Sequence, residues 1–215
     1  MSSATENSER LREPDTDLPF GVNGSEQLTA VQSALVGEYL KLIKKWDRVH
    51  SLVSKGDLNH LEKRHVLDSL ALEPFLKPSS DHLDIGSGAG FPGIPLAICR
   101  PDVNFVLNDR STNRCRFLRE VKFRLNLANV DVQECDIGKQ DSHSDYFDTI
   151  SLRAVAAPEH AWSLALPLLS EQGSVLLYTQ GRFPTDYEGF SQGSVMSCTP
   201  SVRGWITVVG KSTTS

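Results

Sequence analysis

The sequence lacks long apolar runs and paired cysteines, and these absences exclude several classes of protein. Its 215 residues contain no run of about 18 apolar residues, so we expect no membrane-spanning helix. The N-terminus has no apolar segment of the kind that a secretory signal requires. The four cysteines are far apart and form no C-x-x-C pair. That spacing argues against a metal site or a disulfide framework and fits a cytoplasmic protein.

The sequence also lacks an excess of positive charge. Its net charge is −5, and residues 1–27 carry most of it because they contain six acidic residues and two arginines. The overall charge therefore gives no support for binding to a nucleic acid. Residues 1–24 are polar and acidic with few large apolar side chains, so we predict a disordered acidic tail there.

Residues 25–78 have the pattern of a helical N-terminal lobe. Over residues 28–46, large apolar residues recur at steps of three and four, which places them on one face of a helix. Ser25 is the expected N-cap of this helix. A second helical region is expected at residues 58–76, and Pro78 marks its end.

Residues 79–211 alternate between two hydrophobic periods, and this alternation predicts an α/β core. Short apolar runs typical of strands occur at 82–85, 103–108, 129–133, 147–152 and 173–178. Stretches with helical spacing separate several of them, at 92–100, 112–127 and 158–169. Such alternation implies a doubly wound, mostly parallel sheet with helices on both faces. The last part, residues 193–210, predicts an antiparallel hairpin, so residues 25–211 should form one structural domain.

The segment HLDIGSGAGFPGIPLAI, residues 82–98, crowds glycines between a predicted strand and a predicted helix. Such glycines let the backbone approach a ligand, here at Gly86, Ser87 and Gly88. The segment lacks the Gly-Lys-Ser/Thr of a P-loop, and its G-x-G-x-G spacing differs from that of dinucleotide sites. The D-x-G-x-G that begins at Asp84 is more typical of methyltransferases, which bind S-adenosyl-L-methionine. Tight turns in a non-catalytic α/β domain are the alternative.

Polar side chains also stand at the ends of the next two predicted strands. Asp109 lies about 20 residues beyond the glycine loop, where a carboxylate accepts hydrogen bonds from ribose hydroxyls. Asp136 and Ile137 follow the third strand and offer a polar edge and an apolar wall to adenine. Ligands bind outside the carboxyl ends of the strands in a doubly wound sheet, so these residues predict a single cofactor site with the glycine loop.

Four segments carry a resemblance to a known family: RHVLDSLAL, LDIGSGAGFPGIPLAI, RCRFLREV and FDTISLRAVA. Together they resemble the glucose-inhibited division protein B family over about residues 28–182. The resemblance implies a class I, Rossmann-like methyltransferase that uses S-adenosyl-L-methionine to modify N7 of a guanine in small-subunit (16S) ribosomal RNA. It implies that Gly86 and Phe91 line the cofactor site, with Asp109 at the ribose and Arg153 at the mouth of the active site.

The chain departs from the family pattern at several positions on the expected substrate side. Ser51 stands where the family usually has Asn, and Asn113 and Gln180 stand where it usually has Lys. Leu152 replaces the serine of a Ser-Arg-Ala motif. These departures keep two alternatives open. One is a related methyltransferase that acts on another RNA or on a small molecule, and the other is a non-catalytic module that binds the cofactor.

The expected reaction needs no general base, because guanine N7 has a free lone pair and loses no proton on methylation. Catalysis would depend on aligning N7, the methyl carbon and the sulfonium while water is excluded. Arg153 is the candidate catalytic residue, because arginine commonly reads the O6/N7 edge of guanine. It would contact O6, a nearby phosphate or the carboxylate of the cofactor. A salt bridge at the end of a strand is the alternative role.

Candidate substrate-binding residues lie on two predicted helices. Arg64 and His65 lie on the helix at 58–76, where Arg64 and Asp68 are spaced to form an i,i+4 ion pair. Arg116 and Arg119 lie on the predicted outer face of the helix at 112–127, and the lysines that follow residue 40 form another basic patch. The expected partner is small-subunit ribosomal RNA or the assembled small subunit. We expect a monomer and no metal.

Overall fold

The computed structural model describes residues 28–54, 56–139, 146–153 and 156–212. The predicted acidic tail at residues 1–24 and the predicted N-cap Ser25 lie outside these described residues. No helix in the described part of the chain is long and apolar enough to cross a membrane.

The first helix, α1, spans Ala30–His50, and Thr29 rather than Ser25 is its N-cap. Thr29 Oγ1 accepts a hydrogen bond from the backbone N–H of Gln32, whose side chain accepts one in return from the backbone N–H of Thr29. This reciprocal capping box fixes the start of the helix, so the prediction of Ser25 as the cap was wrong. Ser51 ends the helix in the left-handed conformation, with φ of 47°.

The second predicted helical region, residues 58–76, is broken into short pieces. A π-helical turn, η1, covers Glu62–Val66 and runs into α2, Leu67–Leu70, and a 3-10 turn, η2, covers Glu73–Phe75. Asp68 of α2 contacts the sheet, because its backbone carbonyl accepts from the hydroxyl of Tyr178 and its carboxylate accepts from the backbone N–H of Val202.

Seven strands form one sheet in the order β3-β2-β1-β4-β5-β7-β6. The strands β1 to β5 are parallel, and β7 runs antiparallel to both β5 and β6. They span Asp81–Ile85 (β1), Asn104–Asp109 (β2), Val130–Glu134 (β3), Phe147–Leu152 (β4), Leu169–Thr179 (β5), Gly193–Ser201 (β6) and Gly204–Lys211 (β7). This topology confirms the mostly parallel sheet and the antiparallel C-terminal hairpin.

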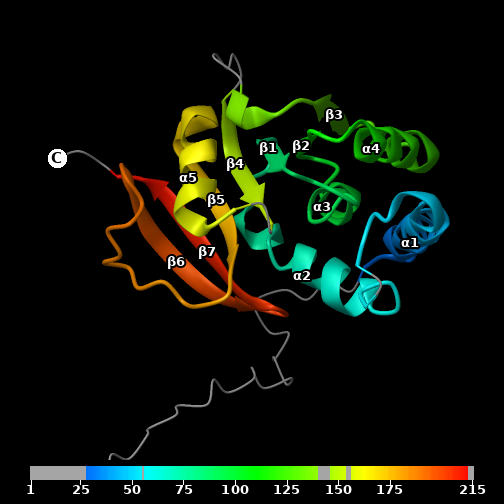
Figure 1. Ribbon diagram of the computed structural model, residues 1–215, viewed down its shortest axis with the longest axis horizontal. Helices are drawn as coiled ribbons and strands as arrows, with labels where there is room; N and C mark the ends of the chain where they lie inside the picture. Colours follow the sequence, from blue (N-terminus) through cyan, green and yellow to red (C-terminus); the bar gives the residue numbers. More distant parts are fainter. Residues whose placement is uncertain (1–27, 55, 140–145, 154–155, 213–215) are drawn as a thin grey trace, which may run out of the picture.

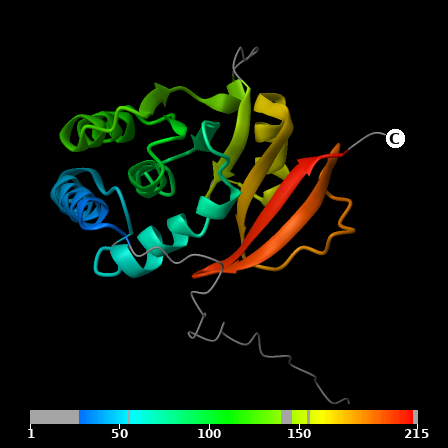
Figure 2. The same ribbon diagram turned by 180° about the vertical axis from the view of Figure 1, so that it is seen from behind.

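Helices cover both faces of the sheet, as a doubly wound fold requires (Figures 1 and 2). On one face lie α3, Gly93–Cys99, and α4, Thr112–Leu125, and α1 packs against both of them. On the other face lies α5, Pro158–Ala165, which continues as the 3-10 turn η4, Leu166–Leu168. Each face has its own cluster of buried apolar side chains. The doubly wound prediction is therefore confirmed.

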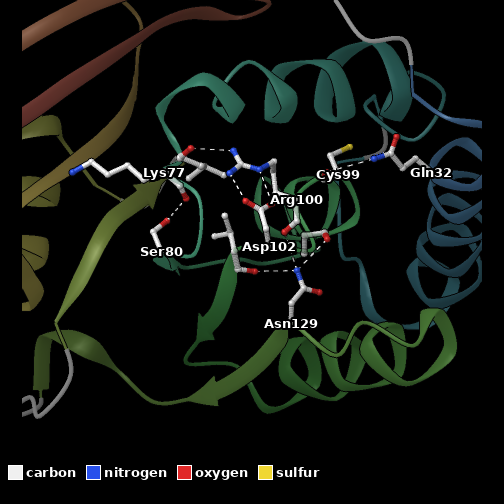
Figure 3. A network of polar contacts seen from close by, with 10 residues as sticks. Gln32, Lys77, Ser80, Cys99, Arg100, Asp102 and Asn129 are labelled. Carbon is white, nitrogen blue, oxygen red and sulfur yellow. Dashed lines mark hydrogen bonds and ion pairs between the residues drawn. The ribbon is translucent and has the colours of Figure 1, made fainter.

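A polar network closes the end of the sheet where the strands β1 and β2 begin (Figure 3). The side-chain amide of Asn129 donates to three backbone carbonyls, those of Ala97, Arg100 and Val103, at 3.1–3.2 Å. The guanidinium of Arg100 makes two hydrogen bonds to Asp102 and a third to the carbonyl of Leu76. These side chains satisfy backbone carbonyls at the end of the sheet opposite the carboxyl ends of the parallel strands.

Candidate functional site

A cleft with a volume of about 680 Å³ opens at the carboxyl ends of the parallel strands. The glycine loop after β1 forms part of its wall, together with the residues that follow β2, β3 and β4. The loop between α1 and η1 contributes Leu52, Val53, Ser54 and Asp57. The cleft is thus shared by the helical lobe and the sheet, at the edge where a doubly wound fold binds its ligands.

The glycine loop depends on backbone conformations that favour glycine. Gly86, Gly88 and Gly90 have φ angles of 70°, 60° and 94°. A Cβ on Gly90 would also lie 2.7 Å from the side chain of Ile94. From α1, the hydroxyl of Tyr39 donates to the carbonyl of Ala89 at 2.6 Å. The loop is therefore held in one shape by its own sequence and by the helical lobe.

Asp84 is buried and binds the far end of the glycine loop through its carboxylate. One carboxylate oxygen accepts from the backbone N–H of Gly93 at 3.2 Å, and the other accepts from the hydroxyl of Ser151 at 2.8 Å. The hydroxyl of Ser87 donates to the backbone carbonyl of Asp84. Burial raises the pKa of Asp84 to about 6 because it penalises the ionised form, and the hydrogen bonds donated to the carboxylate stabilise that form.

Asp109 lies at the carboxyl end of β2, as predicted, and is buried. Its carboxylate accepts from the backbone N–H groups of Gly88 at 3.0 Å and Ser111 at 2.9 Å, and Arg114 Nη1 lies 3.5 Å away. A carboxylate has about four acceptor directions, so one remains for a ligand. Asp109 therefore fixes the glycine loop and still faces the cleft.

Asp136 and Ile137 line the cleft after β3, next to each other, as predicted. Ile137 is buried, whereas Asp136 lies 3.5 Å from Lys139 Nζ. Gly138 completes this wall, and a Cβ there would contact Leu164 of α5 at 3.4 Å. The wall therefore combines an apolar surface with a carboxylate edge, which suits a flat heterocycle.

Arg153, directly after β4, is tied to the helical lobe. One guanidinium nitrogen hydrogen-bonds to His65 Nδ1, and another lies 3.8 Å from the buried carboxylate of Asp68. The guanidinium also lies over the ring of Phe91, 5.3 Å from its centroid. The predicted pair of Arg64 with Asp68 was wrong, because Asp68 turns inward to Arg153.

His65 is neutral in this arrangement, because it must accept at Nδ1 from Arg153. Burial, and next the charge of Arg153, lower the pKa of His65 to about 4. Its ring lies 5.0 Å from that of Phe91, and Asp57 Oδ1 lies 3.6 Å from its Nε2. His65 and Phe91 thus hold the guanidinium at the wall of the cleft.

Of the predicted substrate-binding residues, His65 lines the cleft in the described part of the chain, and the arginines lie outside its lining. Arg64 lies 3.4 Å from Asp57, and Arg119 lies 3.0 Å from Glu134. Arg116 is exposed on α4, as its predicted outer face requires.

Sequence reasoning missed several residues of the cleft. Arg114 lines it from the first turn of α4, and its position shortly after Asp109 was a usable signal. His160, at the start of α5, also lines the cleft. Asp57 lines the cleft from the helical lobe and lies near His65, whereas Tyr39 lies outside the lining and donates to the glycine loop. No local pattern indicated either contact.

Comparisons with known structures agree with this architecture. The chain superimposes on mitomycin 7-O-methyltransferase MmcR with a TM-score of 0.55 at 11% identity, over 86% of this chain and 69% of that one. Precorrin-6y C5,15-methyltransferase from Geobacter metallireducens gives a TM-score of 0.50 at 14% identity, over 76% and 92% of the two chains. At these identities the likeness concerns the fold, which is that of the class I methyltransferases.

Comparisons of sequence reach further. The family model described as rRNA small subunit methyltransferase G matches residues 32–195. Proteins named ribosomal RNA small subunit methyltransferase G are 36% identical in Legionella pneumophila strain Corby, over 74% of this chain and 77% of that one, and 40% identical in Methylococcus capsulatus, over 68% and 70%. The resemblance found in the sequence is confirmed, and the chain belongs to the rRNA small subunit methyltransferase G family of enzymes.

Proposed function

We propose that this methyltransferase transfers a methyl group from S-adenosyl-L-methionine to N7 of a guanine in small-subunit (16S) ribosomal RNA. The observation that carries the proposal is the cleft itself, which joins the glycine loop, the Asp109 carboxylate and Arg153 in a chain of this family. The choice of N7 follows the family resemblance of the sequence. We also propose that the enzyme acts as a monomer in the cytoplasm.

The residues of the cleft fit the cofactor. The free acceptor direction of Asp109 suits a ribose hydroxyl, and the wall of Asp136 and Ile137 suits adenine. The backbone of Gly86 and Gly88, which carries no Cβ, leaves room for the methionine part. When bound, S-adenosyl-L-methionine supplies an electrophilic methyl group on a positively charged sulfonium.

The acceptor chemistry fits a site without a general base. Guanine N7 attacks with its own lone pair, so no side chain has to remove a proton. His65, with a pKa of about 4, stays neutral at pH 7 and holds Arg153 instead of moving protons. The chain's contribution is to orient the base against the methyl donor beside Phe91 and Arg153, and to exclude water.

Variants at Arg153 separate its possible roles. We expect Arg153→Gln to lower single-turnover methylation by about tenfold or more, because orientation of the acceptor is lost. If Arg153 holds the acceptor base or a phosphate, the variant's affinity for S-adenosyl-L-homocysteine in calorimetry stays unchanged. If Arg153 instead contacts the carboxylate of the cofactor, losing that contact lowers both this affinity and the methylation rate. Lys77→Gln, at an exposed lysine before β1 and so at the end of the sheet opposite the cleft, is the control. Full activity of Arg153→Gln would contradict a role for Arg153 in the reaction.

The surface beside the cleft has a basic stripe that suits an RNA backbone. Lys44, Lys45 and Arg48 lie on one side of α1, are exposed, and make no ion pair among the described residues. The ring of Trp46 lies 5.6 Å from Phe117 of α4, so this half of α1 lies against the helix that starts at the cleft. We therefore place the RNA phosphates over α1 and the outer face of α4.

Charge-matched variants test this surface. Lys45→Ala and Arg116→Ala should each weaken RNA binding and reduce the slope of log affinity against log salt by about one, as expected for one lost phosphate contact. Lys77→Ala removes an equal charge beside the polar network at the opposite end of the sheet, and it should leave both values unchanged (Figure 3). Equal effects of all three variants would show a nonspecific charge effect and contradict the proposed surface.

Transfer of labelled methyl groups tests the function itself. Purified protein is incubated with labelled S-adenosyl-L-methionine and either naked 16S ribosomal RNA or assembled small subunits, and the modified nucleotide is mapped by mass. We expect one 7-methylguanine, and the preferred substrate identifies the form of RNA that the enzyme recognises. A protein that binds the cofactor but methylates neither substrate would contradict the proposal in favour of another acceptor.

A further inference from the structure

A chain of hydrogen-bonded polar side chains crosses the buried centre of the sheet between β1 and β4. His82 and Asp84 of β1 lie opposite Thr149 and Ser151 of β4 in the register of the two strands. His82 Nδ1 lies 2.7 Å from Thr149 Oγ1, His82 Nε2 lies 3.0 Å from Ser151 Oγ, and Ser151 Oγ lies 2.8 Å from Asp84 Oδ1. All four residues are at most 1% exposed. So many polar groups in a core are costly unless each is hydrogen-bonded.

The hydrogen-bond partners fix the direction of this chain. Ser151 has one hydroxyl proton and donates it to Asp84, so its oxygen must accept from His82 Nε2–H. A neutral imidazole has one N–H, so Nδ1 accepts from the hydroxyl of Thr149. Every donor therefore points toward the Asp84 carboxylate, and donors aligned in this way strengthen one another.

The chain ends at the group that closes the glycine loop. The second oxygen of Asp84 accepts from Gly93 N, at the far end of the loop that starts at Gly86. A Cβ at Gly93 would lie 2.2 Å from Leu107 and 3.0 Å from Asp84 Oδ2, so this close approach requires glycine. The orientation of the Asp84 carboxylate thus bears directly on the shape of the loop.

We propose that His82 and Ser151 are positioning residues that keep Asp84 ionised and oriented, so that the glycine loop stays closed in the shape that receives the cofactor. This inference rests on the proposed cofactor site and goes beyond it. Among the described residues that line the cleft, none belongs to this hydrogen-bonded series of four side chains. Their effect on the cofactor is therefore transmitted through Gly93 and the loop.

Among the titratable groups around Asp84, Asp84 itself is the one that changes its charge near neutral pH. Burial lowers the pKa of His82 to about 3 and raises the pKa values of Tyr39 and Tyr178, so these three stay neutral. Arg153 is the cation that acts on Asp84. Burial raises the pKa of Asp84 to about 6, and protonation below that pH would turn one carboxylate oxygen into a hydroxyl and weaken the hydrogen bonds that Gly93 N–H and Ser151 donate to the group.

Calorimetry of S-adenosyl-L-homocysteine binding between pH 5 and 8 tests the proposal. In the wild type, we expect affinity to fall as the pH drops through about 6. Ser151→Ala removes a donor to the carboxylate and should move this midpoint up by about one pH unit. His82→Phe should move it in the same direction, whereas His82→Gln, which keeps an N–H toward Ser151, should restore it.

A control separates positioning from general stability. Thr207→Val removes a fully buried hydroxyl that lies 3.0 Å from Thr179 Oγ1 on β5, away from Asp84. It should lower stability without moving the midpoint. A midpoint that Ser151→Ala and His82→Phe leave unchanged would overturn the proposal, and a wild type that binds no S-adenosyl-L-homocysteine would overturn the cofactor site itself.

Ring-nitrogen NMR of the free protein gives a second readout. His82 should carry its proton on Nε2 in the wild type and lose this fixed tautomer in Ser151→Ala. A proton on Nδ1 in the wild type would reverse the donor chain and overturn the proposal.

Discussion

The buried histidine His82 predicts how the protein loses stability in acid. Its pKa is about 3 in the fold, against 6.5 for an ordinary histidine, because burial penalises the charged ring. Between these pH values the unfolded chain binds more protons than the native protein, so stability falls as the pH drops below 6.5. From pH 7 to pH 5 this one residue should cost about 2 kcal/mol.

Two further buried groups act over the same pH range. His65 has a pKa of about 4, so by the same linkage it should lower the free energy of unfolding by about as much as His82 does. Asp84 acts in the opposite direction, because its pKa of about 6 lies above the ordinary 3.8 and the native state therefore gains protons as the pH falls. Between pH 7 and pH 5, Asp84 should therefore raise the free energy of unfolding by about 1 kcal/mol. The three groups together should remove about 2–3 kcal/mol between pH 7 and pH 5.

His82→Gln isolates the contribution of one group, because an amide keeps the hydrogen bonds and cannot take up a proton. Urea titrations at pH 7, 6 and 5, followed by tryptophan fluorescence, to which the buried Trp162 contributes, give the free energy of unfolding. The variant should lose about 2 kcal/mol less than the wild type between pH 7 and pH 5. His60→Gln, at an exposed histidine, should follow the wild type. Parallel pH profiles of wild type and His82→Gln would refute the reasoning.

Two further predictions concern the glycine loop. Gly90→Ala should destabilise the protein by about 2 kcal/mol or more, because φ is 94° and the new Cβ would lie 2.7 Å from Ile94 and 3.0 Å from the Tyr39 hydroxyl; a urea midpoint equal to that of the wild type would contradict this. Tyr39→Phe leaves the buried carbonyl of Ala89 without its donor and should cost about 1–2 kcal/mol, measured in the same way, with a matching fall in S-adenosyl-L-homocysteine affinity; unchanged affinity would separate Tyr39 from the cofactor site.

The strands were predictable because their apolar runs are short and are bounded by polar residues and glycines. The segment at 147–152 matches β4 at both ends, and the carboxyl-end position of Asp109 followed from strand order. In a parallel sheet the ends of neighbouring strands meet at one edge, so the placement of the cleft also followed from the sequence.

Contacts between distant segments were not predictable. The pairing of His82 with Thr149 depends on the register between β1 and β4, and the sequence of a single strand does not specify which residues of its neighbour lie opposite. In the same way, the spacing of Arg64 and Asp68 suggested a helical ion pair, but Asp68 is drawn inward by Arg153 and by the backbone N–H of Val202 at 3.2 Å. At Asp68, tertiary contacts prevailed over local helix geometry.

These tertiary contacts also bear on how the chain divides. The boundary between residues 78 and 79 lies within the single structural domain predicted for residues 25–211, and contacts cross it: Tyr39 donates to the carbonyl of Ala89 in the glycine loop, and Asp68 faces Arg153 after β4. Side chains of α1 share one buried apolar cluster with those of α3 and α4. Removing the lobe would take His65 and Asp68 away from Arg153 and expose the apolar side chains of α3 and α4 that pack against α1. We therefore propose that the lobe and the sheet fold as one unit, and that the helical lobe serves as one wall of the cleft.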